Sequence, residues 1–186
     1  MNKTGIVPPL RLCFFMWLVF AAQIYTGFDF GRFGIYPRQL SGLVGVFAAP
    51  LLHGSFQHLM SNTLPLLILG VTVYFFYPTI ASRVFFYSYF FTNVLVWAFG
   101  RPYLHIGASG LIYGLAAFLI FFGLFKRNFK SVLISLVIVL GYGGMIYGIL
   151  PYNERVSWES HLMGAIVGFV AAFTLSRNKK NQPRQS

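Results

Sequence analysis

The sequence predicts an all-α fold, a polytopic bundle of six transmembrane helices. Of its 186 residues, 57% are hydrophobic and 9% are charged, whereas a soluble domain typically carries about 25% charged residues. The mean hydropathy is +0.69. The apolar runs are long and continuous, unlike the short alternating segments of a β-barrel. The chain therefore has too little polar surface to face water on all sides, and we expect an integral membrane protein.

Six apolar runs are long enough to cross the hydrocarbon core, which requires roughly 20 residues. Glycines, prolines and basic residues separate most of these runs. The first run resembles the apolar part of a signal peptide, but it continues through Ile24 and Tyr25, and we expect it to remain as a span. The predicted spans are 10–27, 56–77, 79–99, 109–125, 131–150 and 158–176. They form one membrane domain, residues 10–176, between an N-terminal segment, 1–9, and a basic tail, 177–186.

The basic residues predict the orientation, because cytoplasmic loops carry an excess of Lys and Arg. Ten of the 14 fall on one side of the predicted membrane: Lys3, Arg11, Arg83, Lys126, Arg127, Lys130, Arg177, Lys179, Lys180 and Arg184. The other side holds Arg32, Arg38, Arg101 and Arg155, with the acids Asp29, Glu154 and Glu159. We therefore expect both termini in the cytoplasm. The minimal six-span architecture favours a bacterial inner membrane, and an organelle membrane is the alternative. The net charge of +11 arises at helix ends, so we expect no nucleic-acid partner.

Two polar side chains occupy matching positions in the predicted bundle. Ser109 opens the span 109–125 within the run His105-Ile-Gly-Ala-Ser-Gly110, and His161 lies near the start of the span 158–176. Both spans run from outside to inside in the predicted topology, so both groups lie toward the outer face. Polar groups inside a membrane bundle are costly and usually functional. A serine needs a base to become a nucleophile, and a neutral imidazole can be that base. The pair indicates serine-type hydrolysis within the membrane.

The same two spans carry glycine faces that would let them pack closely. One face is Gly110-x3-Gly114 and the other is Gly164-x3-Gly168. Small residues at this spacing allow two helix backbones to approach in lipid. If the faces meet, the serine and the histidine at their outer ends come within reach of each other.

A third polar group lies at the outer start of the span 56–77. His58 and Asn62 are four residues apart and share one helical face. Both can donate hydrogen bonds, which a developing oxyanion requires. In the alternative interpretation Asn62 binds a carbonyl of a neighbouring helix and His58 has a capping role.

Together these motifs resemble the rhomboid family of intramembrane serine proteases. The resemblance covers residues 10–176 and agrees in order, spacing and topology. Its motifs are His53-x4-His58-x3-Asn62, Gly107-Ala108-Ser109-Gly110 followed by Tyr113, and His161-x2-Gly164-x3-Gly168.

The resemblance implies a role for each matching residue. Ser109 would be the nucleophile and His161 the general base. The oxyanion hole would be lined by His58, Asn62 and the backbone amide of the serine. Around them the supporting residues would be Gly107, which shapes the loop, Tyr113, which holds the imidazole ring, and the glycines Gly110 and Gly164.

The resemblance also implies the kind of substrate. A rhomboid cleaves a single-span membrane protein after a small residue near the outer face. Entry between the spans 56–77 and 131–150 is one interpretation, because four glycines give the second of these spans thin side-chain cover. Helix–helix packing explains those glycines equally well. We expect no cofactor and no metal.

Three alternatives have weaker support in the sequence. A zinc protease could use the outer histidines His53, His58, His105 and His161, but no His-Glu-x-x-His motif and no acid within a span accompany them. A small transporter would be favoured by inverted repeats or mid-membrane charges, and neither is evident. A catalytically inactive rhomboid-like binding protein would usually lack the serine or the histidine.

Glu159 is two residues from His161 and points to another side of the helix, so we expect a dyad without an orienting acid.

Overall fold

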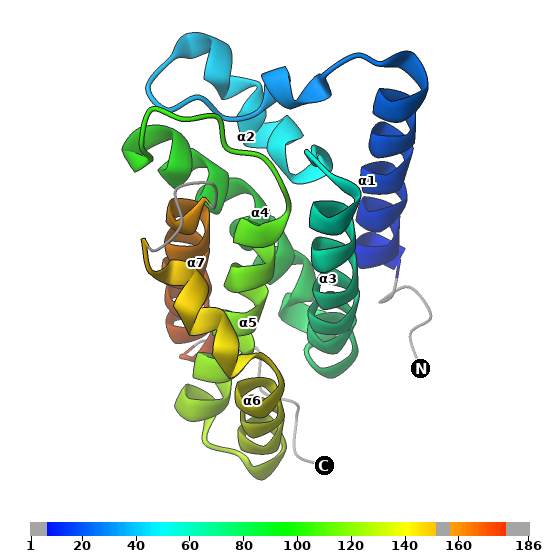
Figure 1. Cartoon of the computed structure of the whole chain (residues 1–186). Helices are drawn as coiled ribbons and strands as arrows, with labels where there is room; N and C mark the ends of the chain where they lie inside the picture. Colours follow the sequence, from blue (N-terminus) through cyan, green and yellow to red (C-terminus); the bar gives the residue numbers. More distant parts are fainter. Residues whose placement is uncertain (1–6, 152–156, 178–186) are drawn as a thin grey trace.

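The computed structural model describes residues 7–151 and 157–177 of the chain. Within these ranges the protein is all-helical, as predicted, with one isolated antiparallel bridge between Ile35 and His105. The α-helices are α1 (Val7–Thr26), α2 (Gly45–Ala48), α3 (Phe56–Phe76), α4 (Pro78–Phe99), α5 (Ser109–Lys126), α6 (Phe129–Tyr142) and α7 (Trp158–Ser176) (Figure 1). The 3₁₀ helices are η2 (Phe30–Phe33), η3 (Leu40–Leu43), η4 (Ala49–Leu51) and η5 (Gly143–Ile149).

Five segments of the described chain are long and apolar enough to cross a membrane: α1, α3, α5, α7 and the continuous stretch Phe129–Ile149 formed by α6 and η5. The remaining long helix, α4, has 22 residues but is less apolar, with buried polar side chains at Ser88, Thr92 and Asn93. Asn93 donates a hydrogen bond to the carbonyl of Val46, 3.0 Å away. The sixth span and the orientation of the bundle therefore stay predictions.

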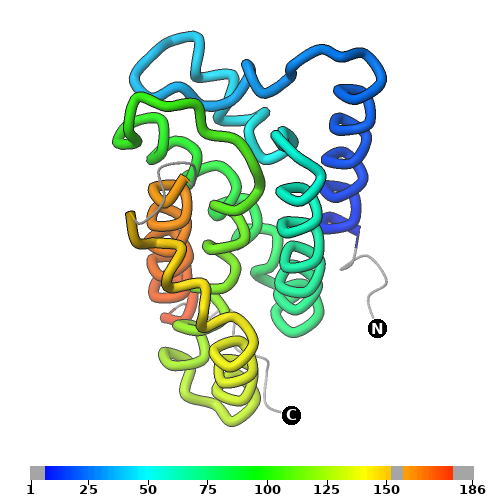
Figure 2. Tube along the Cα trace, viewed as in Figure 1, coloured from blue at the N-terminus to red at the C-terminus, as the bar shows by residue number. Residues whose placement is uncertain are grey.

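Helix α5 is the centre of the bundle. It packs against α3, α4, α6 and α7. Helix α1 packs against α3, on the side of α3 that faces away from α5 (Figures 1 and 2). Its side chains include Leu115, Phe118 and Leu119, which are completely buried. In Figure 1, α1 begins and α7 ends at the lower end of the bundle, while the connection from α1 to α3 and the loop before α5 lie at the upper end.

The predicted contact between the two glycine faces is present. A Cβ at Gly164 would overlap the carbonyl oxygen of Gly110, and one at Gly168 would overlap that of Gly114. On the other side of α5, a Cβ at Gly110 would lie 2.8 Å from Cγ2 of Thr92 in α4. The N-terminal half of α5 is therefore held between α7, which it contacts backbone to backbone, and α4, whose side chains it contacts.

Two predicted segments differ from the structure. The predicted span 131–150 is not one helix: α6 ends at Tyr142, and the chain continues as the 3₁₀ helix η5. Gly141, Gly143 and Gly144 lie at this junction, and glycine weakens an α-helix because it has more backbone freedom to lose. The connection between the first two spans, predicted only as a loop, folds into η2, η3, α2 and η4.

Several sequence-based predictions fall outside the described residues. They are the segment 1–6, the connection 152–156 and the tail 178–186, with the charges Lys3, Glu154, Arg155, Lys179, Lys180 and Arg184.

The glycine contact predicts the effect of added bulk in α7. Gly168→Val places a branched side chain against backbone atoms of α5, and overpacking of this kind costs about 1–3 kcal/mol. We expect a lower unfolding temperature in detergent and a loss of the activity proposed below. Gly141→Val is the control, because a Cβ at Gly141 meets nothing within 4 Å. Equal unfolding temperatures for the two variants would show that the contact is unimportant.

Candidate active site

The loop before α5 is held in place by the folded connection that follows α1. Ile35 and His105 exchange two backbone hydrogen bonds of 2.9 Å, and the N–H of Gly107 donates to the carbonyl of Ala49 at 2.8 Å. Gly107 has a φ of +103°, a conformation that residues with a side chain rarely adopt. These contacts fix the backbone of residues 105–108, and so they fix the position of the next residue, Ser109.

Ser109 is the first residue of α5 and is half-buried at the wall of a cavity of about 970 Å³. Backbone N–H groups in the first turn of a helix have no partner within the helix. They attract negative charge, and so a helix start is suited to an anionic intermediate. The walls of this cavity also include His58, Asn62, Ile112, Tyr113, Tyr142, Met145 and His161.

His161 lies in the first turn of α7 and is 8% exposed. Its Nδ1 is 2.8 Å from the carbonyl oxygen of Gly148. A carbonyl can only accept a hydrogen bond, so Nδ1 carries the proton and Nε2 has a free lone pair. The ring stacks on Tyr113 with centroids 4.1 Å apart and an angle of 7° between planes. The hydroxyl of Tyr113 donates to the carbonyl of Met145 at 2.8 Å.

The structure brings Ser109 and His161 to the same cavity. Among the described residues no hydrogen bond joins the serine hydroxyl to the imidazole. Such bonds are often long in the absence of substrate and shorten when the substrate binds.

Helix α3 brings His58 and Asn62 to the same cavity. The ring of His58 covers the loop, since a Cβ at Gly107 would lie 2.6 Å from its Nε2. Asn62 is 3% exposed, and its amide nitrogen donates to the carbonyl of His58, 2.8 Å away in the same helix. An amide nitrogen has two hydrogens, so Asn62 keeps a second donor. This geometry is compatible with a bond to a ligand in the cavity.

His53, the first residue of the His53-x4-His58-x3-Asn62 motif, precedes α3 and is not among the residues that line the cavity. It is 2% exposed, both ring nitrogens lack a hydrogen-bond partner within the described residues, and its ring centroid is 4.9 Å from that of His58. Burial, followed by the nearby charge of His58, lowers its pKa to about 4, and so the ring is neutral at pH 7. In the described part of the chain, no three His, Cys, Asp or Glu side chains are grouped closely enough to hold a metal ion.

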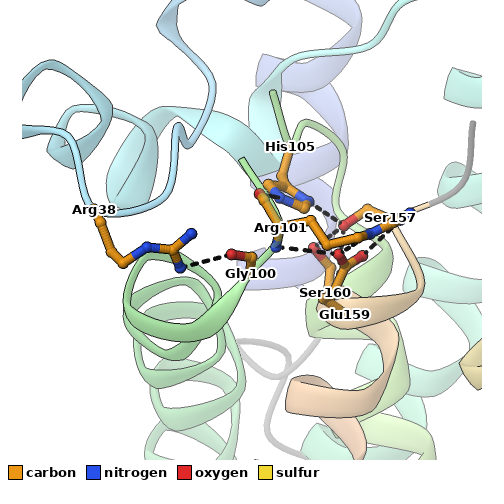
Figure 3. A network of polar contacts seen from close by, with 7 residues as sticks. All are labelled: Arg38, Gly100, Arg101, His105, Ser157, Glu159 and Ser160. Carbon is orange, nitrogen blue, oxygen red and sulfur yellow. Dashed lines mark hydrogen bonds and ion pairs between the residues drawn. The ribbon is translucent and has the colours of Figure 1, made fainter. Parts of the chain in front are cut away.

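A polar network ties the start of α7 to the loop before α5 (Figure 3). Glu159 forms an ion pair with Arg101 and also accepts from its backbone N–H at 3.2 Å. Nδ1 of His105 is 2.6 Å from the hydroxyl of Ser157, which is 2.6 Å from that of Ser160. Nε2 of His105 is 3.1 Å from the carbonyl of Arg101, which fixes the proton on Nε2. Burial lowers the pKa of His105, so its ring is neutral at pH 7.

Sequence reasoning missed this network. It placed Glu159 on a different side of the helix from His161 and predicted no partner for it. In the structure, Glu159 forms an ion pair with Arg101. The signal available in the sequence was a single acid near the outer end of a span, together with an arginine in the loop that precedes the serine.

Comparison with known proteins adds family information. A family model described as the Rhomboid domain matches residues 40–178. An uncharacterized protein of Mycobacterium tuberculosis (strain ATCC 25618 / H37Rv) is 41% identical over 77% of the chain and 63% of its own length. An uncharacterized protein of Mycobacterium leprae is 36% identical over 92% of the chain and 72% of its own length. The chain thus spans less than two thirds of the length of the first of these relatives.

The network predicts the effect of neutralising its acid. Glu159→Gln loses the ion pair with Arg101, and a hydrogen bond to a charged group contributes about 1.5–3 kcal/mol when buried. The Arg101 side chain is 30% exposed, so we expect a loss near the lower end of that range, measured by unfolding in detergent. Arg11→Gln removes an exposed charge from α1 and should change stability by less than about 0.5 kcal/mol. A Glu159→Gln protein as stable as the wild type would contradict the prediction.

Proposed function

The chain belongs to the rhomboid family, and from this premise we propose that it is an intramembrane serine endopeptidase that uses a Ser109–His161 dyad. The observation that carries the proposal is the bond from Nδ1 of His161 to the carbonyl of Gly148. It leaves Nε2 as a proton acceptor on a residue that lines the same cavity as Ser109.

The proposed reaction begins with attack of the serine oxygen on the carbonyl carbon of a substrate peptide bond, while Nε2 of His161 takes the hydroxyl proton. The tetrahedral intermediate carries its negative charge on the former carbonyl oxygen. His161 then gives the proton to the leaving amine, and an acyl-enzyme remains. A water molecule, deprotonated by the same nitrogen, hydrolyses the ester and regenerates the serine.

Three donors are available for the oxyanion. The backbone N–H of Ser109 lies at the start of α5, where it has no partner within the helix. The second amide hydrogen of Asn62 and the imidazole of His58 belong to the same cavity wall. Donors that are already fixed in place stabilise developing charge more strongly than water does, because they need no reorientation during the reaction.

The proposed substrate class rests on family membership, which implies membrane-protein substrates within a lipid bilayer. A transmembrane helix must unwind locally before its peptide bond can be attacked, because each carbonyl is bonded to the N–H four residues later. Glycine, proline or polar residues near the cleavage point make this unwinding easier. We propose a single-span protein cleaved after a small residue near the outer face.

The dyad predicts that Ser109→Ala and His161→Ala each reduce cleavage by about 10⁴-fold or more, since the nucleophile and its base act as one unit. Cleavage of a membrane-embedded substrate and labelling by a fluorophosphonate probe measure the two effects. Both variants should retain the helix content and detergent solubility of the wild type. Cleavage by a folded Ser109→Ala protein would refute the dyad. Loss of wild-type activity with EDTA, restored by zinc, would instead support the histidine metal site.

Asn62→Ala should reduce the turnover number by about 10²–10³-fold, the typical cost of one oxyanion donor. Because Asn62 acts on the intermediate and not on the nucleophile, the probe should still label Ser109 in this variant. Ser61→Ala is a matched control at the preceding residue of α3. Ser61 also lines the cavity, but its hydroxyl donates to the carbonyl of His58 in its own helix. Wild-type turnover in Asn62→Ala would remove Asn62 from the oxyanion hole.

A further inference from the structure

The 3₁₀ helix η5 supplies both backbone carbonyls that hold the proposed base and its aromatic support. Gly148 accepts from His161 Nδ1, and Met145 accepts from the hydroxyl of Tyr113. The last carbonyls of a helix have no partner within it, and η5 ends at Ile149. The end of η5 therefore leaves acceptors free at the point where the imidazole lies.

Gly148 differs from the other glycines in this stretch. A Cβ at Gly148 would overlap the Tyr113 hydroxyl and lie 3.1 Å from His161 Nδ1, whereas a Cβ at Gly141 or Gly144 would meet nothing within 4 Å. The Tyr113 hydroxyl cannot yield to such an atom without losing its bond to Met145. Only a residue without a side chain lets the backbone at position 148 approach the imidazole this closely.

We propose that Gly148 is a positioning residue, whose carbonyl fixes the tautomer and orientation of His161 in the role that an acidic side chain has in a triad. The inference rests on the proposed function for its catalytic consequence, although the tautomer itself is a property of the resting protein. Without this acceptor a neutral imidazole exchanges its proton between the two nitrogens. A ring with its proton on Nε2 has no lone pair at that nitrogen to accept the serine proton.

The same segment forms part of the cavity wall. Tyr142 and Met145 line the cavity together with Ser109 and His161. Movement of η5 away from α7 would therefore enlarge the cavity and release both carbonyl contacts in one step. It follows that the base is correctly oriented only when η5 lies against α7.

The first test measures the tautomer directly. Nitrogen-15 NMR of histidine-labelled protein in detergent distinguishes protonated from unprotonated ring nitrogens, and His161→Ala identifies the signals of His161. We expect a protonated Nδ1 and an unprotonated Nε2 in the wild type and in Gly144→Ala, and a mixture of tautomers in Gly148→Ala. An Nε2-protonated ring in the wild type would overturn the proposal even if Gly148→Ala does not fold. A wild-type spectrum in Gly148→Ala would overturn it as well.

The second test measures the catalytic consequence. Gly148→Ala should lower kcat by about 10²-fold, the cost of misplacing a catalytic group by about 1 Å, with KM changed by less than about twofold. Fluorophosphonate labelling should slow by the same factor, because the probe reports the reactivity of the serine. Gly144→Ala should match the wild type in all three measurements. A raised KM with normal kcat and labelling would assign Gly148 to substrate entry and overturn the positioning role.

The two tests separate this inference from the proposed function. If the tautomer shifts in Gly148→Ala but the wild-type protein cleaves no peptide bond, the positioning role stands and the protease assignment fails. If Ser109→Ala abolishes cleavage and Gly148→Ala is indistinguishable from the wild type, the protease assignment stands and the positioning role fails.

Discussion

The close backbone contact between α5 and α7 is the constraint on which the rest of the structure depends. Lipid tails are as apolar as leucine side chains, so helices in a membrane associate by packing and hydrogen bonding more than by hydrophobic burial. Gly110 and Gly114 on α5 meet Gly164 and Gly168 on α7 with no side chain between them. This contact sets the distance between the two helix starts, and the serine and the histidine lie at those starts.

The loop that leads to α5 is not helical, and its backbone polar groups bond to other parts of the chain. Backbone N–H and C=O groups away from water need partners. The bridge between Ile35 and His105, and the bond from Gly107 to Ala49, supply partners for the loop that leads to α5. The ion pair between Arg101 and Glu159 then attaches that loop to α7. The loop is thus held from both sides before the first residue of α5.

The distribution of acidic and backbone acceptors is consistent with a dyad mechanism. Glu159, the acid nearest in sequence to His161, is bonded to Arg101. The imidazole instead contacts the neutral carbonyl of Gly148 and the face of Tyr113. A neutral acceptor can define a tautomer as well as a carboxylate can, because both accept only. It also avoids the cost of placing another charge inside a membrane bundle.

The sequence by itself determined the fold class, the approximate helix bounds, the two glycine faces and the positions of Ser109 and His161 at matching helix starts. These properties follow from hydropathy and from helical spacing, which are local and readable along the chain. The end of α6 at Tyr142, the folded connection after α1 and the attachment of Glu159 to Arg101 were decided by tertiary structure. Tertiary structure also decided that the carbonyl of Gly148 accepts the hydrogen bond from His161. Every residue has a backbone carbonyl, so no residue type indicates which carbonyl will meet a side chain 13 residues away in the sequence. That choice depends on how η5 packs on α7, and packing between distant segments exists only in the folded chain.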